Sequence, residues 1–300
     1  MTTSKTLHSG EYLALHESFC RWLELLNYSK GTRQVIPGHA REFLAQVEGA
    51  GKAQIGQIEA VDAQGFLEGL KVKIGPRTGR QYSPGHLNKY IQALGLLSRY
   101  LRESGRGQVG FALQWLDPLA RKPTWLTISE VNKLYDATTD TVLGARDRVM
   151  LSVYYGCGLR LSEGAALDVK DVLLDSGLVH VRKGKGYKER LVPLARGSRA
   201  ILEHYLSAAR PQLLQARSTE ALFVGAQKGV AMTNQSLYIR IKQLTKKARI
   251  KKRVGTHTLR HSIATHLLES GMPLERIKDF LGHASMDSTQ LYTHLVNQKL

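Results

Sequence analysis

Apolar positions in the first part of the chain recur at helical spacing. The stretch EYLALHESFCRWLELL places large apolar side chains near one stripe, formed by Leu13, Phe19, Trp22, Leu23 and Leu26. The pattern predicts two helices within residues 11–50 and a third over 61–72. A fourth begins with Ser83 and Pro84, which suit the N-cap and first turn of a helix. The N-terminal part is therefore predicted to be all-helical.

The helical pattern is interrupted at residues 118–123, within the stretch DPLARKPT. Two prolines and basic residues lie there between apolar runs, a composition typical of an interdomain linker. We therefore predict an N-terminal domain over 1–117 and a C-terminal domain over 124–300.

The second part of the chain combines helical runs with one β-rich segment. Thr127, followed three residues later by Glu130, forms a capping-box signature for a helix start. The stretch LGARDRVMLSVYYGCGLRLSEGAAL predicts a helix, a break at Gly-Cys-Gly and a second helix. Two short runs, GLVHVR at 177–182 and ERLVPL at 189–194, predict a β-hairpin with a basic, glycine-containing turn. Further helices are predicted over 197–209, 233–249, 257–270, 273–282 and 286–296. The expected fold is mostly α with a small antiparallel β-sheet.

Composition excludes several classes of protein. Hydrophobic residues make up 42% of the chain, and no apolar run approaches the roughly 18 residues that a membrane span needs. The two cysteines, Cys20 and Cys157, provide neither a disulfide framework nor a zinc cluster. The N-terminus lacks the basic-then-apolar order of a secretion signal. We expect a cytoplasmic protein with no membrane association, metal or other cofactor.

Charge points to a polyanionic partner. The formal net charge is +18, and residues 121–300 carry +14 of it against +4 for residues 1–120. A basic excess of this size is typical of nucleic-acid binding, although a ribosomal or membrane-surface protein would have a similar balance. With DNA as the partner, the protein would be associated with the nucleoid.

Five residues of the second part have the chemistry needed to break a phosphodiester without a metal: Arg160, His257, Arg260, His283 and Tyr292. Forked guanidinium groups bind phosphate oxygens with two donors each. A tyrosine hydroxyl can attack phosphorus, and histidines move protons near neutral pH. Each residue also has an ordinary explanation, because tyrosines at helical spacing usually pack and a basic helix can simply lie on phosphate.

Local settings strengthen some of these candidates. Arg160 follows a glycine-containing turn at a helix start, where backbone donors favour an anion. Glu163, three residues on, either supports the guanidinium or forms an ordinary surface pair with it. His257 and Arg260 are three residues apart, on one face of a helix whose apolar side contains Ile263. His261 and His266, on the same helix, have no clear role.

Two further groups of basic residues are candidates for DNA contact. The hairpin turn has lysines at 183, 185 and 188, and chemistry alone does not choose among them. A second run, without any acidic residue, is predicted to dock on the DNA backbone and consists of Arg240, Lys242, Lys246, Lys247, Arg249, Lys251, Lys252 and Arg253.

Together these motifs resemble the tyrosine recombinase (phage integrase) family, and especially its Xer-like members. The stretches GLRLSE, GKGYKERLVPL, HTLRHSIATHLLESG and LGHASMDSTQLYTH stand in the family's order and approximate spacing. The resemblance implies an α+β catalytic domain over 124–300, preceded by a helical core-binding domain that clamps DNA.

The resemblance also implies a role for each motif residue. Arg160 and Arg260 would grip the scissile phosphate, and Lys185 would protonate the leaving 5′ oxygen. His257 would be the acid–base histidine, His283 would stabilise the transition state, and Tyr292 would form a 3′-phosphotyrosyl link. Glu163 matches the acidic residue that supports the site.

The implied activity is site-specific recombination through a Holliday junction, by a homotetramer or a mixed tetramer with a related recombinase on double-stranded DNA sites. Only eight residues follow Tyr292, where many relatives carry a further helix that docks on a neighbouring protomer, so the contact between protomers is left open. The alternatives are a type IB topoisomerase-like enzyme and a non-catalytic DNA-binding regulator derived from a recombinase.

Overall fold

The computed structural model describes residues 6–76, 78–117, 124–182, 189–214, 218–226 and 229–282. The chain divides into two compact units, Met1–Lys122 and Pro123–Leu300. Each unit has its own hydrophobic core. In the described part of the chain, no helix is both long and apolar enough to cross a membrane.

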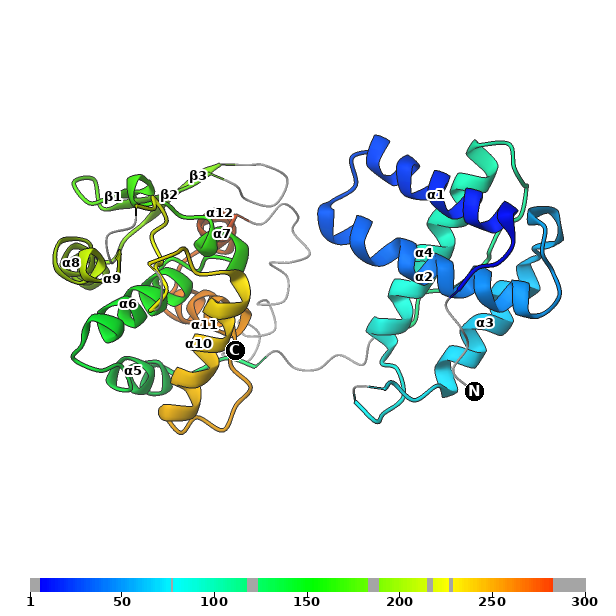
Figure 1. The fold of residues 1–300 in the computed structure, drawn as a ribbon. Helices are drawn as coiled ribbons and strands as arrows, with labels where there is room; N and C mark the ends of the chain where they lie inside the picture. The colour runs from blue at the N-terminus through cyan, green and yellow to red at the C-terminus, as the bar shows by residue number, and fades with distance from the viewer. Residues whose placement is uncertain are drawn as a thin grey trace. The chain divides into compact units, whose positions relative to one another are not determined.

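The first unit is helical, as predicted (Figure 1). Its helices are α1 (Gly10–Leu25), α2 (Lys30–Gly49), the short η1 (Ile55–Gln57), α3 (Ala60–Val72) and α4 (Pro84–Glu103). Serine side chains cap three of them: Ser9, Ser29 and Ser83 each accept a hydrogen bond from a backbone N–H in the first turn. The helix boundaries therefore follow local capping chemistry.

The apolar stripe predicted for α1 is partly wrong. Phe19 and Leu23 are buried, but Leu13 and Leu26 are 44% and 46% exposed. The buried positions include Tyr12 and Leu15 instead. The helix is rotated relative to the predicted stripe because its partners in the core, rather than its own apolar spacing, decide which side is covered.

The second unit contains a small sheet at one edge of a group of helices (Figure 1). Its first part comprises α5 (Ile128–Asp136), α6 (Val142–Leu151), the π-helix η2 (Ser152–Gly156), α7 (Leu161–Ala165) and the 3-10 turn η3 (Val169–Asp171). The remaining helices are α8 (Arg196–His204), the π-helix η5 (Tyr205–Ala209), α9 (Arg210–Leu214), α10 (Asn234–Lys247), α11 (Thr256–Glu269) and α12 (Leu274–Leu281). The predicted capping box is present, since Thr127 and Glu130 exchange hydrogen bonds of 2.8 and 3.2 Å. The helix predicted over 286–296 lies outside the described residues.

The sheet is antiparallel, in the order β1 (Val172–Leu173), β2 (Leu178–Val181) and β3 (Arg190–Pro193). The β2–β3 hairpin was predicted, whereas β1 was not, because two residues are too short to show a strand pattern. Val179 pairs with Val192, and both are buried. The sheet lies beside α7 and α12 (Figure 1).

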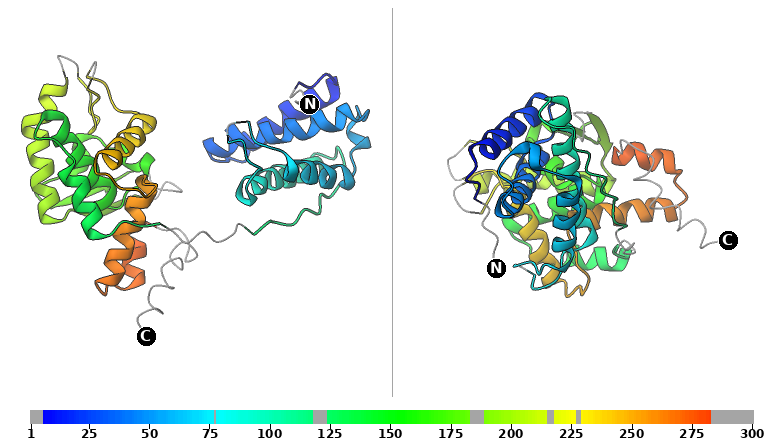
Figure 2. Two further views of the ribbon diagram at one scale, coloured as in Figure 1. Left: turned by 90° about the horizontal axis from the view of Figure 1, so that it is seen from below. Right: turned by 90° about the vertical axis from the view of Figure 1, so that its right-hand side faces the viewer.

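Helices α11 and α12 lie side by side (Figure 2). Ala264 of α11 packs with Ile277 and Leu281 of α12 in a small apolar cluster. The turn before α7 approaches the end of α12 closely. A Cβ on Gly158 would lie 2.8 Å from Leu281 Cδ2, and the φ of +61° at this position also favours glycine. This approach brings the sequence motif GLRLSE to the end of α12.

A buried ion pair joins α6 to α10. Asp147 is fully buried and accepts hydrogen bonds from Arg240 Nε at 2.9 and 3.0 Å and from Arg240 Nη2 at 2.5 Å. Arg146 Nη2 lies 3.3 Å from the same carboxylate. Arg240, predicted from the sequence to contact the DNA backbone, therefore has a structural partner inside the unit.

Replacing Arg240 with alanine would leave Asp147 buried with Arg146 as its remaining ionic partner. We expect Arg240→Ala to lower the free energy of unfolding by about 3 kcal/mol, the lower end of the range for broken buried pairs, because Arg146 remains and the Arg240 side chain is itself 30% exposed. Urea denaturation followed by circular dichroism measures this change. Lys246→Ala, on the exposed side of the same helix, is the control and should change stability by less than about 0.5 kcal/mol. Equal stability of the two variants would contradict the structural role of Arg240.

Candidate active site

Two of the predicted arginines converge on the end of α12. Arg160 precedes α7 and donates from Nη2 to the carbonyl of Gly282 at 3.0 Å. Arg260, from α11, donates from Nη2 to the carbonyl of Leu281 at 2.7 Å and from Nη1 to that of Gly158 at 2.5 Å. The carbonyls at a helix C-terminus have no partners within the helix and carry partial negative charge. The end of α12 therefore attracts both guanidinium groups to one place.

A third arginine, Arg190, joins this cluster from the first residue of β3. It donates from Nη1 and Nη2 to the two carboxylate oxygens of Glu163, at 3.2 and 2.9 Å. Its Nε lies 3.4 Å from the carbonyl of Phe280. Sequence reasoning missed Arg190, because in ERLVPL it is one more basic residue beside a lysine-rich turn.

Glu163 is the acidic centre of the cluster. Its carboxylate is buried and accepts from Arg160 Nη1 at 2.6 Å and from the Arg160 backbone N–H at 3.0 Å, in addition to Arg190. Glu163 therefore holds the Arg160 guanidinium from a buried position. It does not form an ordinary surface pair, because a surface pair would leave this carboxylate in water.

The pKa of Glu163 follows from these contacts. Burial by itself would raise the pKa, but hydrogen bonds from Arg190 and the Arg160 backbone, together with the charge of Arg190, outweigh burial and lower the pKa from 4.5 to about 2. Glu163 is therefore ionised at neutral pH. With Arg160, Arg190 and Arg260, it forms a group of four side chains with two net positive charges, which suits an anion.

The histidines of α11 differ in their surroundings. His257 is exposed in the first turn. His266 Nδ1 lies 2.8 Å from the hydroxyl of Tyr155, and the ring of His261 meets that of Trp125 edge-on at 6.1 Å. His261 and His266 therefore have contacts within the fold, whereas His257 is exposed.

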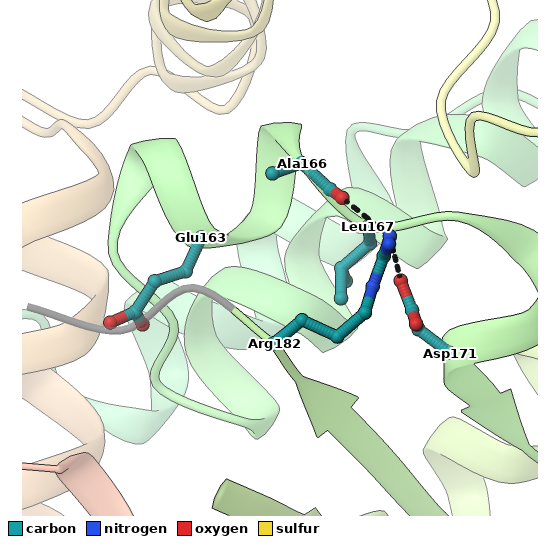
Figure 3. Close-up of a pocket in the computed structure, with 5 residues that line it drawn as sticks. All are labelled: Glu163, Ala166, Leu167, Asp171 and Arg182. Atoms are coloured by element: carbon teal, nitrogen blue, oxygen red, sulfur yellow. Dashed lines mark hydrogen bonds and ion pairs between the residues drawn. The ribbon is translucent and has the colours of Figure 1, made fainter. Parts of the chain in front are cut away.

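Lys185, His283 and Tyr292 lie outside the described residues. The strand ends beside the lysine-bearing turn are described, and both are anchored. Arg182 follows β2 and binds Asp168 at 2.6 Å. It also binds Asp171 at 2.7 Å and the carbonyl of Ala166 at 3.2 Å, the two contacts drawn in Figure 3. Arg182, Asp171 and Ala166 line a small pocket together with Leu167 and Glu163. On the other strand, Arg190 binds Glu163.

The basic run of α10 and the following segment divides into two groups. In the first group Lys246, Lys247, Arg249, Lys251 and Arg253 are exposed. Lys252 is exposed as well, but it belongs to the second group because it has partners inside the unit. Lys242 lies over the ring of Tyr238, and Lys252 binds Glu130 at 2.6 Å and the carbonyl of Trp125 at 3.0 Å. Together with the Arg240–Asp147 pair, these contacts give part of the run partners inside the unit, which the sequence pattern did not predict.

Comparison with known proteins places the chain in a family. The phage integrase family profile matches residues 124–299. Tyrosine recombinase XerD of Pseudomonas aeruginosa is 35% identical over 292 residues, which cover 95% of each chain. Tyrosine recombinase XerD of Staphylococcus epidermidis is 44% identical over 179 residues, or 59% of this chain and 60% of that relative.

A solved structure has the same fold. The XerH site-specific recombinase, in a pre-cleavage complex with its difH substrate, superposes with a TM-score of 0.73 over 99% of this chain and 97% of that one, at 21% identity. At this identity the likeness concerns the fold alone. The sequence matches, extending over nearly the whole chain, carry the assignment: the protein belongs to the phage integrase family and is a site-specific tyrosine recombinase.

Proposed function

We propose that the cluster at the end of α12 binds the scissile phosphate of a DNA recombination site. The observation that carries this proposal is the convergence of Arg160 and Arg260, 100 residues apart in sequence, with a buried carboxylate holding Arg160. Two guanidinium groups neutralise the non-bridging oxygens, and their stabilisation grows as negative charge develops in the transition state.

The remaining roles follow from the family motifs. Tyr292 attacks the phosphorus, forms the 3′-phosphotyrosyl link and releases a 5′ hydroxyl, with Lys185 donating the proton to the leaving oxygen. The exposed His257 exchanges protons, and His283, which follows Gly282 in sequence, stabilises the transition state. The covalent link conserves the energy of the broken bond, so the rejoining step needs neither a nucleotide nor a metal.

The exposed basic residues after the middle of α10 contribute DNA affinity rather than sequence reading. The helical N-terminal unit is proposed to clamp the duplex from its other side. Strand exchange through a Holliday junction requires four active sites on two DNA segments, so we propose a homotetramer, or a mixed tetramer with a related recombinase, acting on DNA in the cytoplasm at the nucleoid.

Two alternative functions make different predictions from recombination. A type IB topoisomerase-like enzyme would relax supercoiled DNA as a monomer without paired sites, and a regulator would bind DNA without cleaving it. The relatives and structural neighbours do not favour either. A relaxation assay beside a two-site recombination assay separates the first from recombination.

The nucleophile assignment predicts the behaviour of Tyr292→Phe. The variant lacks the hydroxyl that attacks phosphorus, so it should bind DNA within about twofold of the wild type while forming no covalent adduct. Nicked duplexes tiled across the DNA that flanks the gene trap the adduct, which denaturing electrophoresis detects. Arg210→Lys is the control, because Arg210 binds the carbonyls of Thr219 and Ala221. An adduct formed by Tyr292→Phe would show that another residue is the nucleophile.

The ionised Glu163 predicts a pH-dependent difference in stability. Because its folded-state pKa is about 2, against 4.5 ordinarily, its stabilising contribution is complete above about pH 5 and is lost as pH falls toward 2. At pH 7 the free energy of unfolding of the wild type should exceed that of Glu163→Gln by on the order of 2–3 kcal/mol. This difference in stability should become smaller below about pH 5. Urea unfolding at a series of pH values measures it. A gap that does not change with pH would mean that the carboxylate's charge is not stabilised by the fold.

The two groups of the basic run predict different salt effects. Lys247→Ala should lower the slope of log affinity against log salt by about 1, since its exposed ammonium is available to a phosphate. Lys252→Ala should change the slope less, because Lys252 already pairs with Glu130. Fluorescence anisotropy with a labelled duplex at several salt concentrations measures both. Equal salt slopes for Lys247→Ala and Lys252→Ala would contradict the division of the basic run into residues available to DNA and residues with partners inside the unit.

A further inference from the structure

Arg190 lies where three of the segments that form the candidate site, β3, α7 and α12, meet. From β3 it reaches Glu163 of α7 with both terminal nitrogens, and Phe280 of α12 with Nε. Its side chain is 12% exposed and that of Glu163 is 1% exposed, so the pair is shielded from water. The two-donor contact fixes both the distance and the orientation of the carboxylate.

Arg190 also packs closely over the residue that follows α12. Gly282 has a φ of +65°, and a Cβ built there would lie 2.9 Å from Cδ, Nε and Nη1 of Arg190. The Arg190 side chain therefore occupies the space above the residue that terminates the helix. The carbonyl of that same glycine accepts a hydrogen bond from Arg160.

Charge gives Arg190 a second effect on Arg160. A carboxylate paired with Arg160 alone would cancel its positive charge and weaken its attraction for phosphate. With Arg190 bound to the same carboxylate, the three side chains carry one net positive charge. Glu163 can then hold Arg160 without neutralising the site.

We infer that Arg190 is a positioning residue for the recombination reaction: it fixes the Glu163 carboxylate, and through it the guanidinium of Arg160, against the scissile phosphate. This inference rests on the function proposed above for Arg160. Arg190 acts through Glu163 and does not itself contact the reacting atoms.

Arg190→Lys tests the inference, because lysine keeps the charge but replaces the two-donor fork with a single ammonium. We expect the rate of covalent adduct formation on the trapped nicked duplex to fall about 10- to 100-fold, with the dissociation constant for DNA within about threefold of the wild type. Arg210→Lys, an equivalent loss of an arginine fork elsewhere in the unit, should keep both values near those of the wild type.

A double-mutant cycle shows whether Arg190 acts through Glu163. If it does, adding Arg190→Lys to Glu163→Gln should lower the adduct rate by less than about threefold further. Fully multiplicative effects would mean that Arg190 acts independently, and would overturn the inference. So would an Arg190→Lys rate equal to that of Arg210→Lys.

One further measurement separates the result from an effect on folding, and a second variant tests the same inference. Circular dichroism locates a temperature at which Arg190→Lys is folded, and the rates are compared there. Glu163→Asp keeps the charge but shortens the side chain, so it cannot reach both arginines, and its adduct rate should also fall at least about 10-fold. A Glu163→Asp rate near that of the wild type would overturn the inference. Failure of the proposed function has a different signature, because wild type and Arg210→Lys would then form no adduct at all, and both proposals would be withdrawn.

Discussion

The site depends on one buried carboxylate. Glu163 lies where α7, β3 and α12 meet, and it accepts hydrogen bonds from two guanidinium groups and one backbone N–H. An isolated carboxylate in this position would be strongly destabilised by loss of water, but the two arginines reverse the balance and keep it ionised. The same contacts orient Arg160. The stability of this region and the arrangement of its arginines therefore rest on the same interaction.

The end of α12 provides the complementary half of the arrangement. Three consecutive carbonyls, those of Phe280, Leu281 and Gly282, face Arg190, Arg260 and Arg160 respectively. A helix C-terminus supplies such acceptors without any acidic side chain, so it orders the arginines while leaving their formal charge intact. A second carboxylate in that place would order them equally well but would reduce the attraction for phosphate.

Much of this protein could be predicted from local sequence. Ser83 with Pro84, the Thr127–Glu130 capping box and the apolar period located most of the described helices to within a few residues, because these signals depend on neighbours along the chain. The short elements η1, η3 and α9 were not predicted. The motif residues Arg160, Glu163 and Arg260 were predicted as candidates, and the structure brings them to one place. The domain roles and all the catalytic assignments, those of Arg160 and Arg260 included, stay predictions.

Other features required the tertiary structure, for a common physical reason. Whether a charged side chain is exposed or paired depends on groups far away in sequence: Arg240 meets Asp147 across 93 residues, and Arg190 meets Glu163 across 27 and Phe280 across 90. The buried side of α1 was decided in the same way, by the surface against which it packs. The sequence by itself determined the helices, the family and the types of residue available for chemistry. Only the fold decided which arginines gather at the end of α12 and which pair elsewhere, because burial and pairing arise from contacts that no local pattern encodes.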